Sequence, residues 1–228
     1  MNLNKHRDFF NPENLETDIH IIGCGAVGST IAEQMARLGV KRLHLYDFDT
    51  VTAHNITNQM FFASQIGEQK TKAITAILKL INPEIEVIQH NKGWIPNTPL
   101  SGYVFLAVDN IETRKEIVDN NICNQNIIAM FDARMGLTNA QAFATLWNDE
   151  GRKKFKETMN FTHEEAKTET PISACGTTLS VTPTVRIICS YIVANFINVT
   201  LGQPITKTIF LDAFDMTLDA FDDYGLKE

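Results

Sequence analysis

The chain has 228 residues, with 20 Lys or Arg against 27 Asp or Glu and a formal net charge of −7. This acidic balance argues against nucleic acid as the main ligand, because binding to a phosphate backbone usually needs a basic face. With 44% hydrophobic and 21% charged residues, the composition excludes a disordered or fibrous chain. We expect one large domain that buries about 70% of its unfolded surface.

The N-terminus and the cysteines favour a cytoplasmic protein. Residues 1–7 carry positive charge with no apolar segment behind it, so they do not predict a secretory signal. The longest apolar stretch, from Ile187 to Val199, is too short for a membrane span. No two cysteines have Cys-x-x-Cys spacing, so we expect no structural zinc site and no disulfide framework.

The first half alternates β-rich runs with helical patterns, which predicts βαβ units and a mostly parallel sheet. Strands are predicted at 18–22, 42–46, 84–89, 103–108 and 127–131. Helices are predicted at 29–38, 70–81 and 111–123. The first of these helices ends at Gly39, and the second ends before Asn82-Pro83.

The pattern changes after Thr145. Residues 148–170 are crowded with charge and show little apolar periodicity, which is typical of a solvated loop or an exposed helix. A mobile cover over a site is the alternative interpretation. An apolar helix is predicted at 184–201, a last strand begins at 209–211, and 219–228 is expected to be an acidic tail.

Together these patterns predict a Rossmann-like α/β fold, in which helices flank a mostly parallel sheet. A charged crossover loop and a C-terminal apolar helix plus strand complete it. The expected division is an N-terminal arm (1–17), a nucleotide-binding half (18–147), a charged loop or lid (148–174), and a C-terminal part (175–228) that completes the same domain.

A glycine-rich loop connects the first predicted strand to the first predicted helix. Gly23, Gly25 and Gly28 form a G-x-G-x-x-G pattern. The first glycine allows a tight turn, the second lets backbone N–H groups approach a phosphate, and the third lets helix and strand pack closely. The helix N-terminus behind the loop favours anions. The pattern predicts a nucleotide site without deciding which nucleotide binds.

Polar residues after the second predicted strand indicate which nucleotide binds and which reaction follows. Asp47 stands where an acid could hold a ribose hydroxyl, as in NAD enzymes. Hydride transfer has no evident use for a second acid at Asp49, for Asn55 ahead of Gln59, or for Lys70. Adenylation does, because joining a carboxylate to the α-phosphorus of ATP needs a fixed ribose, Mg²⁺ held by acids, and cations over the leaving pyrophosphate.

Four motifs in order resemble the ThiF/MoeB/HesA family, the bacterial relatives of ubiquitin-activating enzymes. They are the glycine loop 23–28; Asp47-Phe48-Asp49 with Val51, Asn55 and Gln59; Ile66-Gly67 with Lys70 and Asn82-Pro83; and Asp109-Asn110 with Arg114, Asn121 and Cys123. The resemblance covers roughly residues 18–202. Their order and spacing are more specific than the glycine loop alone.

The resemblance implies roles for individual residues. It implies that Gly23, Gly25 and Gly28 line ATP, Asp47 holds the ribose with Asp49 close by, Asn55 polarises the α-phosphate region, Lys70 contacts the phosphates and Asp109 supports Mg²⁺. Structural alternatives remain open: the acids as caps of turns or of the helix near Ile111, Asn55 as a turn residue, and Lys70 as a solvated helix residue. Arg114 is interpreted as a structural salt-bridge residue.

Three departures from the family pattern affect these expectations. Asn58 stands where the family has a phosphate-binding arginine, and losing that cation weakens transition-state stabilisation. Arg7 could replace it across a homodimer, or could be a disordered surface residue. The family's zinc-binding cysteine pairs are missing, and the chain stops soon after its last predicted strand, so we expect no ubiquitin-fold or adaptor domain.

Cys175 stands where several family members place the cysteine that accepts the activated acyl group. Its neighbours Ser173, Gly176 and Thr177 could leave it exposed and reactive, but an inert cysteine is the alternative. Cys24 lies inside the glycine loop, and Cys123 and Cys189 fall on predicted apolar helix faces. We expect these three to be packing residues.

The main hypothesis is an ATP- and Mg²⁺-dependent adenylyltransferase. The resemblance implies that it activates the C-terminal carboxylate of a small ubiquitin-like or sulfur-carrier protein ending in glycine, and that it forms a homodimer. Three alternatives remain: a non-catalytic relative that binds nucleotide or a partner, a tRNA-modifying dehydratase of the same family, and an NAD-dependent oxidoreductase.

Overall fold

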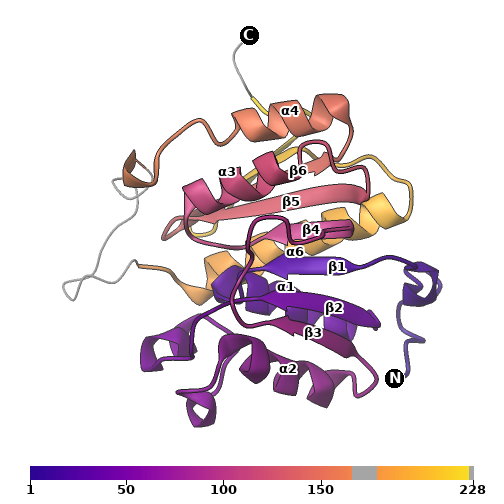
Figure 1. Cartoon of the computed structure of the whole chain (residues 1–228), viewed down its shortest axis with the longest axis vertical. Coiled ribbons are helices and arrows are strands. Elements are labelled where there is room, and N and C mark those ends of the chain that lie inside the picture. Colours follow the sequence, from indigo (N-terminus) through magenta and orange to yellow (C-terminus); the bar gives the residue numbers. More distant parts are fainter. Residues whose placement is uncertain (166–178, 226–228) are drawn as a thin grey trace.

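The computed structural model describes residues 1–165 and 179–225, and its eight strands form one sheet in the order β3-β2-β1-β4-β5-β6-β7-β8 (Figure 1). The strands are β1 (Ile19–Ile22), β2 (Arg42–Tyr46), β3 (Glu86–His90), β4 (Gly102–Leu106), β5 (Ile127–Met135), β6 (Asn139–Leu146), β7 (Thr208–Asp212) and β8 (Thr217–Phe221). The first five pair in parallel, and β6 to β8 add antiparallel strands. The predicted Rossmann-like α/β class is confirmed.

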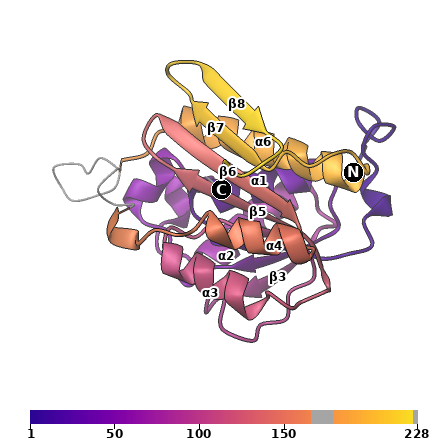
Figure 2. The same ribbon diagram turned by 90° about the horizontal axis from the view of Figure 1, so that it is seen from above.

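Five α-helices flank the sheet in the described parts of the chain. They are α1 (Ala26–Arg37), α2 (Lys70–Ile81), α3 (Ile111–Asn120), α4 (Asp149–Glu157) and α6 (Thr182–Thr200), and short 3₁₀ helices lie at η1 (Pro12–Asn14), η2 (Ala53–Thr57) and η3 (Ala63–Gln65). Helices α3 and α4 cover one face, and α1, α2 and α6 cover the other (Figures 1 and 2). None of these helices combines the length and hydropathy needed to cross a bilayer.

The core beneath α6 centres on Phe196. Its ring makes edge contacts with Tyr103, Phe105 and Phe131, at centroid distances of 4.9, 5.8 and 6.4 Å. These partners come from the adjacent central strands β4 and β5, so one aromatic side chain fixes the apolar helix across the sheet. The apolar helix predicted at 184–201 is therefore confirmed as α6, and the structure packs it on the sheet.

Several sequence-based boundaries need correction. The helix predicted at 111–123 ends at Asn120, so Cys123 lies in the following turn and is exposed instead of packed. The predicted acidic tail begins inside a strand, because Thr217–Phe221 forms β8. The sequence pattern did not predict the strand that the structure shows at Asn139–Leu146, which is β6. The charged segment after residue 148 begins with α4, whose Phe155 is fully buried.

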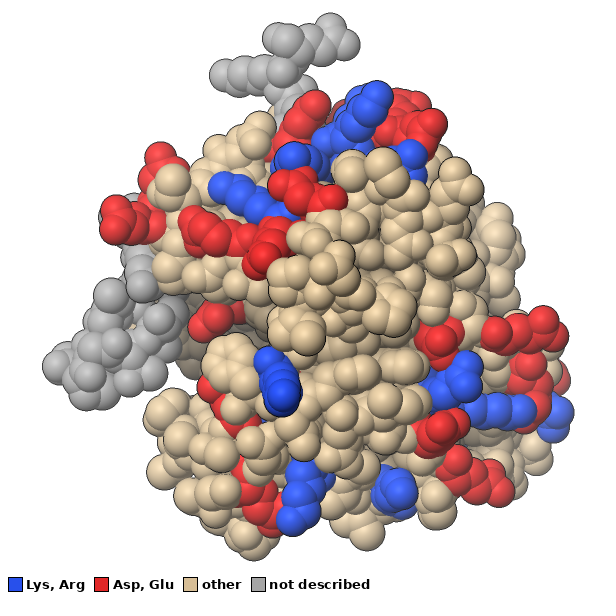
Figure 3. Space-filling view, in the orientation of Figure 1, with Lys and Arg blue, Asp and Glu red and all other residues tan. Residues whose placement is uncertain are grey.

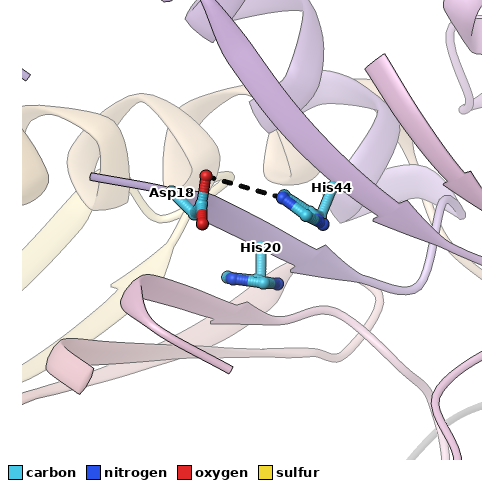
Figure 4. A group of neighbouring side chains, drawn as sticks. All are labelled: Asp18, His20 and His44. Atoms are coloured by element: carbon cyan, nitrogen blue, oxygen red, sulfur yellow. Dashed lines mark ion pairs between the residues drawn. The ribbon is translucent and has the colours of Figure 1, made fainter. Parts of the chain in front are cut away.

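A cluster of histidines lies across β1, β2 and β3: His20 stacks on His44 and His44 stacks on His90, and Figure 4 shows His20 and His44 beside Asp18. Asp18, His20 and His44 bring one potential ligand atom each to within 4.8 Å of one another. However, the two imidazole rings stack at 4.4 Å with 27° between their planes, so their in-plane nitrogen lone pairs do not converge on one point. The Arg42 guanidinium, 2.7 Å from the Asp18 carboxylate, further disfavours a cation. We interpret the group as a hydrogen-bonded cluster and not as a metal centre.

Candidate nucleotide site

The glycine loop lies where β1 ends, at the point where strand order reverses between β1 and β4, which is the usual ligand position in such sheets. Gly23 has φ +99°, and a Cβ there would lie 2.6 Å from the carbonyl oxygen of Ala107. A Cβ on Gly28 would lie 1.8 Å from the carbonyl oxygen of Gly23. A Cβ on Gly25 meets nothing within 4 Å. The outer two glycines serve backbone packing, and only Gly25 borders open space.

Asp47 ties this loop to the end of β2. Its carboxylate accepts hydrogen bonds from the backbone N–H groups of Cys24 at 2.7 Å and Asp49 at 2.8 Å. Burial raises the pKa of the Asp47 carboxyl, and the Lys70 charge and these hydrogen bonds oppose that shift. Each carboxylate oxygen keeps a second lone pair, so the group can still accept a hydrogen bond from a ligand.

Lys70 is the first residue of α2, and its charge acts on the Asp47 carboxylate. Its Nζ donates to Oδ2 of Asp49 at 2.8 Å, and its side chain is only 9% exposed. Backbone hydrogen bonds also hold these two segments together. The Lys70 N–H donates to the Asp49 carbonyl at 3.0 Å, and Thr50 and Gln69 form an isolated antiparallel β-bridge. Lys70 is therefore a fixed, buried cation at the edge of the site and not a solvated helix residue.

Asn55 lies in the 3₁₀ helix η2, between β2 and α2, and is buried. Its Oδ1 accepts from both the backbone N–H and the hydroxyl of Thr52, each at 2.9 Å. This capping arrangement matches the alternative interpretation of Asn55 as a turn residue and fixes its side chain. Asn58 follows as the last residue of that turn and is half-buried.

Asp109 follows β4 in the loop that packs against Gly23, and it is exposed. The side chain that caps α3 is that of Asn110, which accepts from the Thr113 N–H at 2.9 Å. Asp109 is therefore not the cap of this helix. The carboxyl ends of β1, β2 and β4 thus bring the glycine loop, Asp47 and Asp109 to one edge of the sheet.

A buried charge network lies under the Asp109 loop. Arg114 donates to the Asp132 carboxylate, to the Ala133 carbonyl at 2.9 Å and to the Val108 carbonyl. Arg134 donates to the other Asp132 oxygen at 2.8 Å. Burial lowers the pKa of both arginines to about 9. The expected structural salt bridge of Arg114 is confirmed, but sequence reasoning missed its partners.

Arg134 extends the network to the segment after α4. It donates to the carbonyl of Thr158 at 2.6 Å and to its hydroxyl at 2.8 Å. Its guanidinium lies 4.3 Å from the ring centroid of Phe143 and 5.3 Å from that of Phe161. This one side chain therefore connects β5, β6 and the chain that leads away from α4.

A second cation that sequence reasoning did not assign lies near Asn58. Arg186, in the first turns of α6, donates to the hydroxyl of Thr30 at 3.0 Å and contacts Met60. The nearby hydroxyl of Thr182 donates to the Thr57 carbonyl at 2.8 Å. The start of α6 therefore packs on the turn that carries Asn58.

The remaining two predicted site residues are not placed with the others. Arg7 is exposed in the N-terminal segment, which packs on Gly39 and hydrogen-bonds to Leu38 at the far end of α1. That helix of 12 residues separates it from the glycine loop by about 18 Å. Cys175 lies outside the described residues. Among the cysteines that are described, Cys24 and Cys189 are buried, as expected, and burial raises the pKa of both thiols.

A protein-family model named "ThiF family" matches residues 13–225. The chain belongs to the ThiF family. The motifs that suggested this resemblance lie on the elements described above, with the glycine loop, Asp47, Lys70 and Asp109 around one edge of the sheet.

Among curated proteins, this ThiF family chain is similar to ubiquitin-like modifier-activating enzyme 5 of Drosophila melanogaster, at 32% identity over 133 residues. That match covers 50% of this chain and 32% of the relative. The enzyme of the same name from Dictyostelium discoideum is 34% identical over 103 residues, covering 45% of this chain and 24% of the relative. The alignments span at most about a third of each relative.

Two solved structures show the same fold as this ThiF family member at low identity. The PaaA structure has a TM-score of 0.75 at 18% identity, covering 98% of this chain and 69% of that one. The structure of Escherichia coli MccB with ATP has a TM-score of 0.72 at 17% identity, covering 92% of this chain and 64% of that one. These likenesses confirm the Rossmann-like arrangement.

Proposed function

We propose that the chain is an ATP-dependent adenylyltransferase. Its substrate would be the C-terminal carboxylate of a small ubiquitin-like or sulfur-carrier protein ending in glycine. Membership of the ThiF family and the names of the curated relatives support this choice. The observation that carries it is the open space at Gly25, bordered by the loop that Asp47 holds, with the buried cation of Lys70 beside Asp49.

The residues at this edge fit ATP. Open space at Gly25 lets phosphate oxygens approach backbone N–H groups at the start of α1, where the helix dipole favours anions. Asp47 has lone pairs left for the ribose hydroxyls, and hydrogen bonds from those hydroxyls would offset the unfavourable burial of its charge. Lys70 would turn from Asp49 toward the phosphates.

Asp109 fits Mg²⁺, because it is an exposed carboxylate on the loop that packs against Gly23. When bound, Mg²⁺ would neutralise phosphate charge. The chain's own contribution is to hold this loop in place: Arg114 fixes the Val108 carbonyl, and Asp132 fixes Arg114.

In the proposed reaction, a carboxylate oxygen of the partner protein forms a bond to the α-phosphorus of ATP. The bond from that phosphorus to the α,β-bridging oxygen breaks, and pyrophosphate leaves with the electron pair. Lys70 stabilises the charge of the leaving group. The proposal assigns the amide donors of Asn55 to the α-phosphate, because its Oδ1 already accepts from Thr52.

Two further roles are part of this proposal. Arg7 acts on the site of a second copy in a homodimer, since it lies at the far end of α1 in its own chain. The Cys175 thiolate attacks the acyl carbon of the adenylate and forms a thioester, as the bond from that carbon to the phosphate oxygen breaks and AMP leaves with the electron pair. The cytoplasmic setting is proposed with it, because a thiol nucleophile needs reducing conditions.

Isotope exchange between pyrophosphate and ATP, in the presence of candidate carrier proteins, tests the reaction. The proposal expects exchange that depends on the carrier's C-terminal carboxylate and stops when that terminus is amidated. Absence of exchange with every carrier, together with absence of ATP binding, would rule the proposal out.

A non-catalytic relative is the second candidate, and Asn58 in place of the family arginine favours it. Such a protein would bind ATP without accumulating an adenylate. Thermal shifts with ATP·Mg²⁺ and with NAD(H) separate this candidate and the main proposal from an oxidoreductase, because a ligand stabilises the state that binds it.

The surface argues against the tRNA-modifying alternative on the face seen in Figure 3. There the basic side chains are interleaved with acidic ones and form no continuous basic area. Around α4, Lys154 pairs with Glu150 and Lys156 pairs with Asp119. A gel-shift with total tRNA would expose this function if it existed.

A further inference from the structure

The β7–β8 hairpin exposes several large apolar side chains, of which Phe210 and Phe221 pack against each other at a centroid distance of 6.1 Å. Figure 2 shows it as the outer edge of the sheet. The exposed residues are Phe210 (39%), Phe214 (58%), Met216 (89%), Leu218 (37%) and Phe221 (44%). Single apolar residues scattered on a surface are ordinary, but apolar side chains exposed on both faces of one edge hairpin mark an interaction surface; Phe221 and Leu218 lie on opposite faces of β8.

Strand β8 is also an open edge. All five of its residues are exposed, and its register with β7 runs without a bulge from Thr208↔Phe221 to Asp212↔Thr217. Proteins usually guard such edges with lysine, proline or bulges, because unpaired N–H and C=O groups accept another strand. Residues 208–225 contain no lysine, arginine or proline.

The charge of the hairpin decides which strand could bind. Residues 208–225 contain five aspartates and no basic residue. Asp212 and Asp223 accept backbone N–H groups in local turns. The carboxylates of Asp215, Asp219 and Asp222 have no ion pair or hydrogen bond within the described part of the chain.

These charges exclude a second copy as the natural occupant. Two β8 strands paired edge to edge would bring Asp219 and the flanking Asp215 and Asp222 of one copy beside those of the other, and like charges across adjacent strands are destabilising. A strand in which lysine or arginine alternates with apolar residues would instead place its cations on the Asp219 face of β8, where they form favourable cross-strand pairs, and its apolar residues on the opposite face over Leu218.

We propose that β8 is a docking site for a β-strand of a partner protein, in which apolar residues alternate with lysine or arginine. The partner strand extends the sheet, with backbone hydrogen bonds giving affinity and side chains giving selectivity. Strand β8 is five positions from β1, or about 24 Å at the usual strand spacing. A partner bound there leaves the nucleotide site open.

Two peptides of equal length test the proposal, one alternating lysine and valine and one alternating glutamate and valine. Fluorescence anisotropy should show binding of the lysine peptide, weakened at high salt, and at least tenfold weaker binding of the glutamate peptide. Hydrogen exchange should slow at residues 217–221 on binding. Charge reversal by Asp219→Lys with Asp222→Lys should weaken the lysine peptide at least tenfold.

The matched control reverses two exposed acids elsewhere, by Asp8→Lys with Glu16→Lys, and should leave peptide binding unchanged. Thermal melting verifies that both double variants fold. Equal binding by both variants, or protection away from β8, would overturn the proposal. So would a wild-type dimer in sedimentation that Phe221→Ser abolishes. These readouts need no ATP, so they stand apart from the adenylation reaction.

Discussion

The Nζ of Lys70 donates a hydrogen bond to the Asp49 carboxylate across 2.8 Å, although the two residues are 21 positions apart in the chain. The cation is nearly buried, whereas its partner carboxylate is 51% exposed. Asp49 can therefore be solvated by water when the lysine turns away. The pair keeps a charged, positioned ammonium beside the glycine loop until an anion replaces the carboxylate.

Replacing Lys70 by methionine should reduce pyrophosphate exchange roughly 10²–10³-fold, because charges that act on a transferring phosphoryl group contribute on this scale. Lys72→Met is the matched control, since Lys72 is exposed two residues further along α2. Initial rates at saturating ATP measure the effect. An equal loss in both variants would mean that Lys70 does not touch the phosphates.

Alanine substitutions at two glycines of the loop should have opposite effects. Gly25→Ala should fold with a melting temperature near that of the native chain, because its Cβ meets nothing within 4 Å and its φ of −74° suits alanine. It should lose the stabilisation by ATP·Mg²⁺, since the methyl group fills the space where phosphate approaches. Differential scanning fluorimetry with and without nucleotide measures both effects.

Gly28→Ala should instead destabilise the free protein. Its Cβ would lie 1.8 Å from the Gly23 carbonyl oxygen, so α1 must move away from β1. We expect the free energy of unfolding to fall by roughly 1–3 kcal/mol, as for other overpacked sites. A Gly25→Ala variant that still binds ATP normally would argue against the proposed phosphate position.

Elements with a strong local pattern could be predicted from the sequence, and elements defined by pairing could not. Helix α2 begins at Lys70 and ends at Ile81, as its apolar periodicity and the Asn82-Pro83 stop predict. Strand β6 packs alternate alanines, and alanine gives little strand signal. In β8 the acidic residues were interpreted as a tail, but the register with β7 defines a strand.

In the site, too, residues within motifs could be predicted, and contacts that depend on strand register could not. Asp47 and Lys70 sit within motifs of the family, so the resemblance implied that both lie at the nucleotide site, and the charge of Lys70 does act on the Asp47 carboxyl. The Arg114–Asp132 contact could not, because the parallel register Leu106↔Asp132 brings Asp132 beside the loop after β4. A buried arginine implies a partner, but the sequence does not say which acid provides it.

Removing the shared carboxylate of that network should be costly. Asp132 is fully buried and accepts from both Arg114 and Arg134. Asp132→Asn would leave two buried guanidinium groups without a counter-charge, so we expect a loss of roughly 3–5 kcal/mol in the free energy of unfolding. Urea denaturation measures it, with the exposed Asp119→Asn as control.

Acid should destabilise the protein through the three stacked histidines His20, His44 and His90. Burial lowers the pKa of His20 to about 3, and the pKa values of His44 and His90 are lowered as well, mainly by burial. Below the ordinary value of 6.5 the unfolded state binds protons that the folded state does not, so stability falls as the pH drops toward 3. Each such group contributes at most about 1.4 kcal/mol per pH unit.

His20 is the group to test, since Tyr46, His44 and the Ser101 N–H surround its ring. The other charges that act on it are those of Asp18 and His90. Urea denaturation at pH 7.5 and pH 5.0 should show a smaller acid-induced loss for His20→Asn than for the native chain. His54→Gln, at an exposed position, should behave like the native chain. Equal losses in all three would count against the assignment.

Position 58 decides between the catalytic and non-catalytic interpretations. Asn58 is half-buried at the end of η2, the turn whose Asn55 is fixed by Thr52, and Thr57 in the same turn accepts from α6. An arginine here would stand on a rigid turn close to the proposed phosphates. Asn58→Arg should raise pyrophosphate exchange at least tenfold, because an added cation stabilises the leaving group. Asn58→Gln, of similar length but uncharged, should leave the rate unchanged. An unaltered rate in Asn58→Arg, with ATP still bound, would favour a nucleotide-binding protein without adenylation activity.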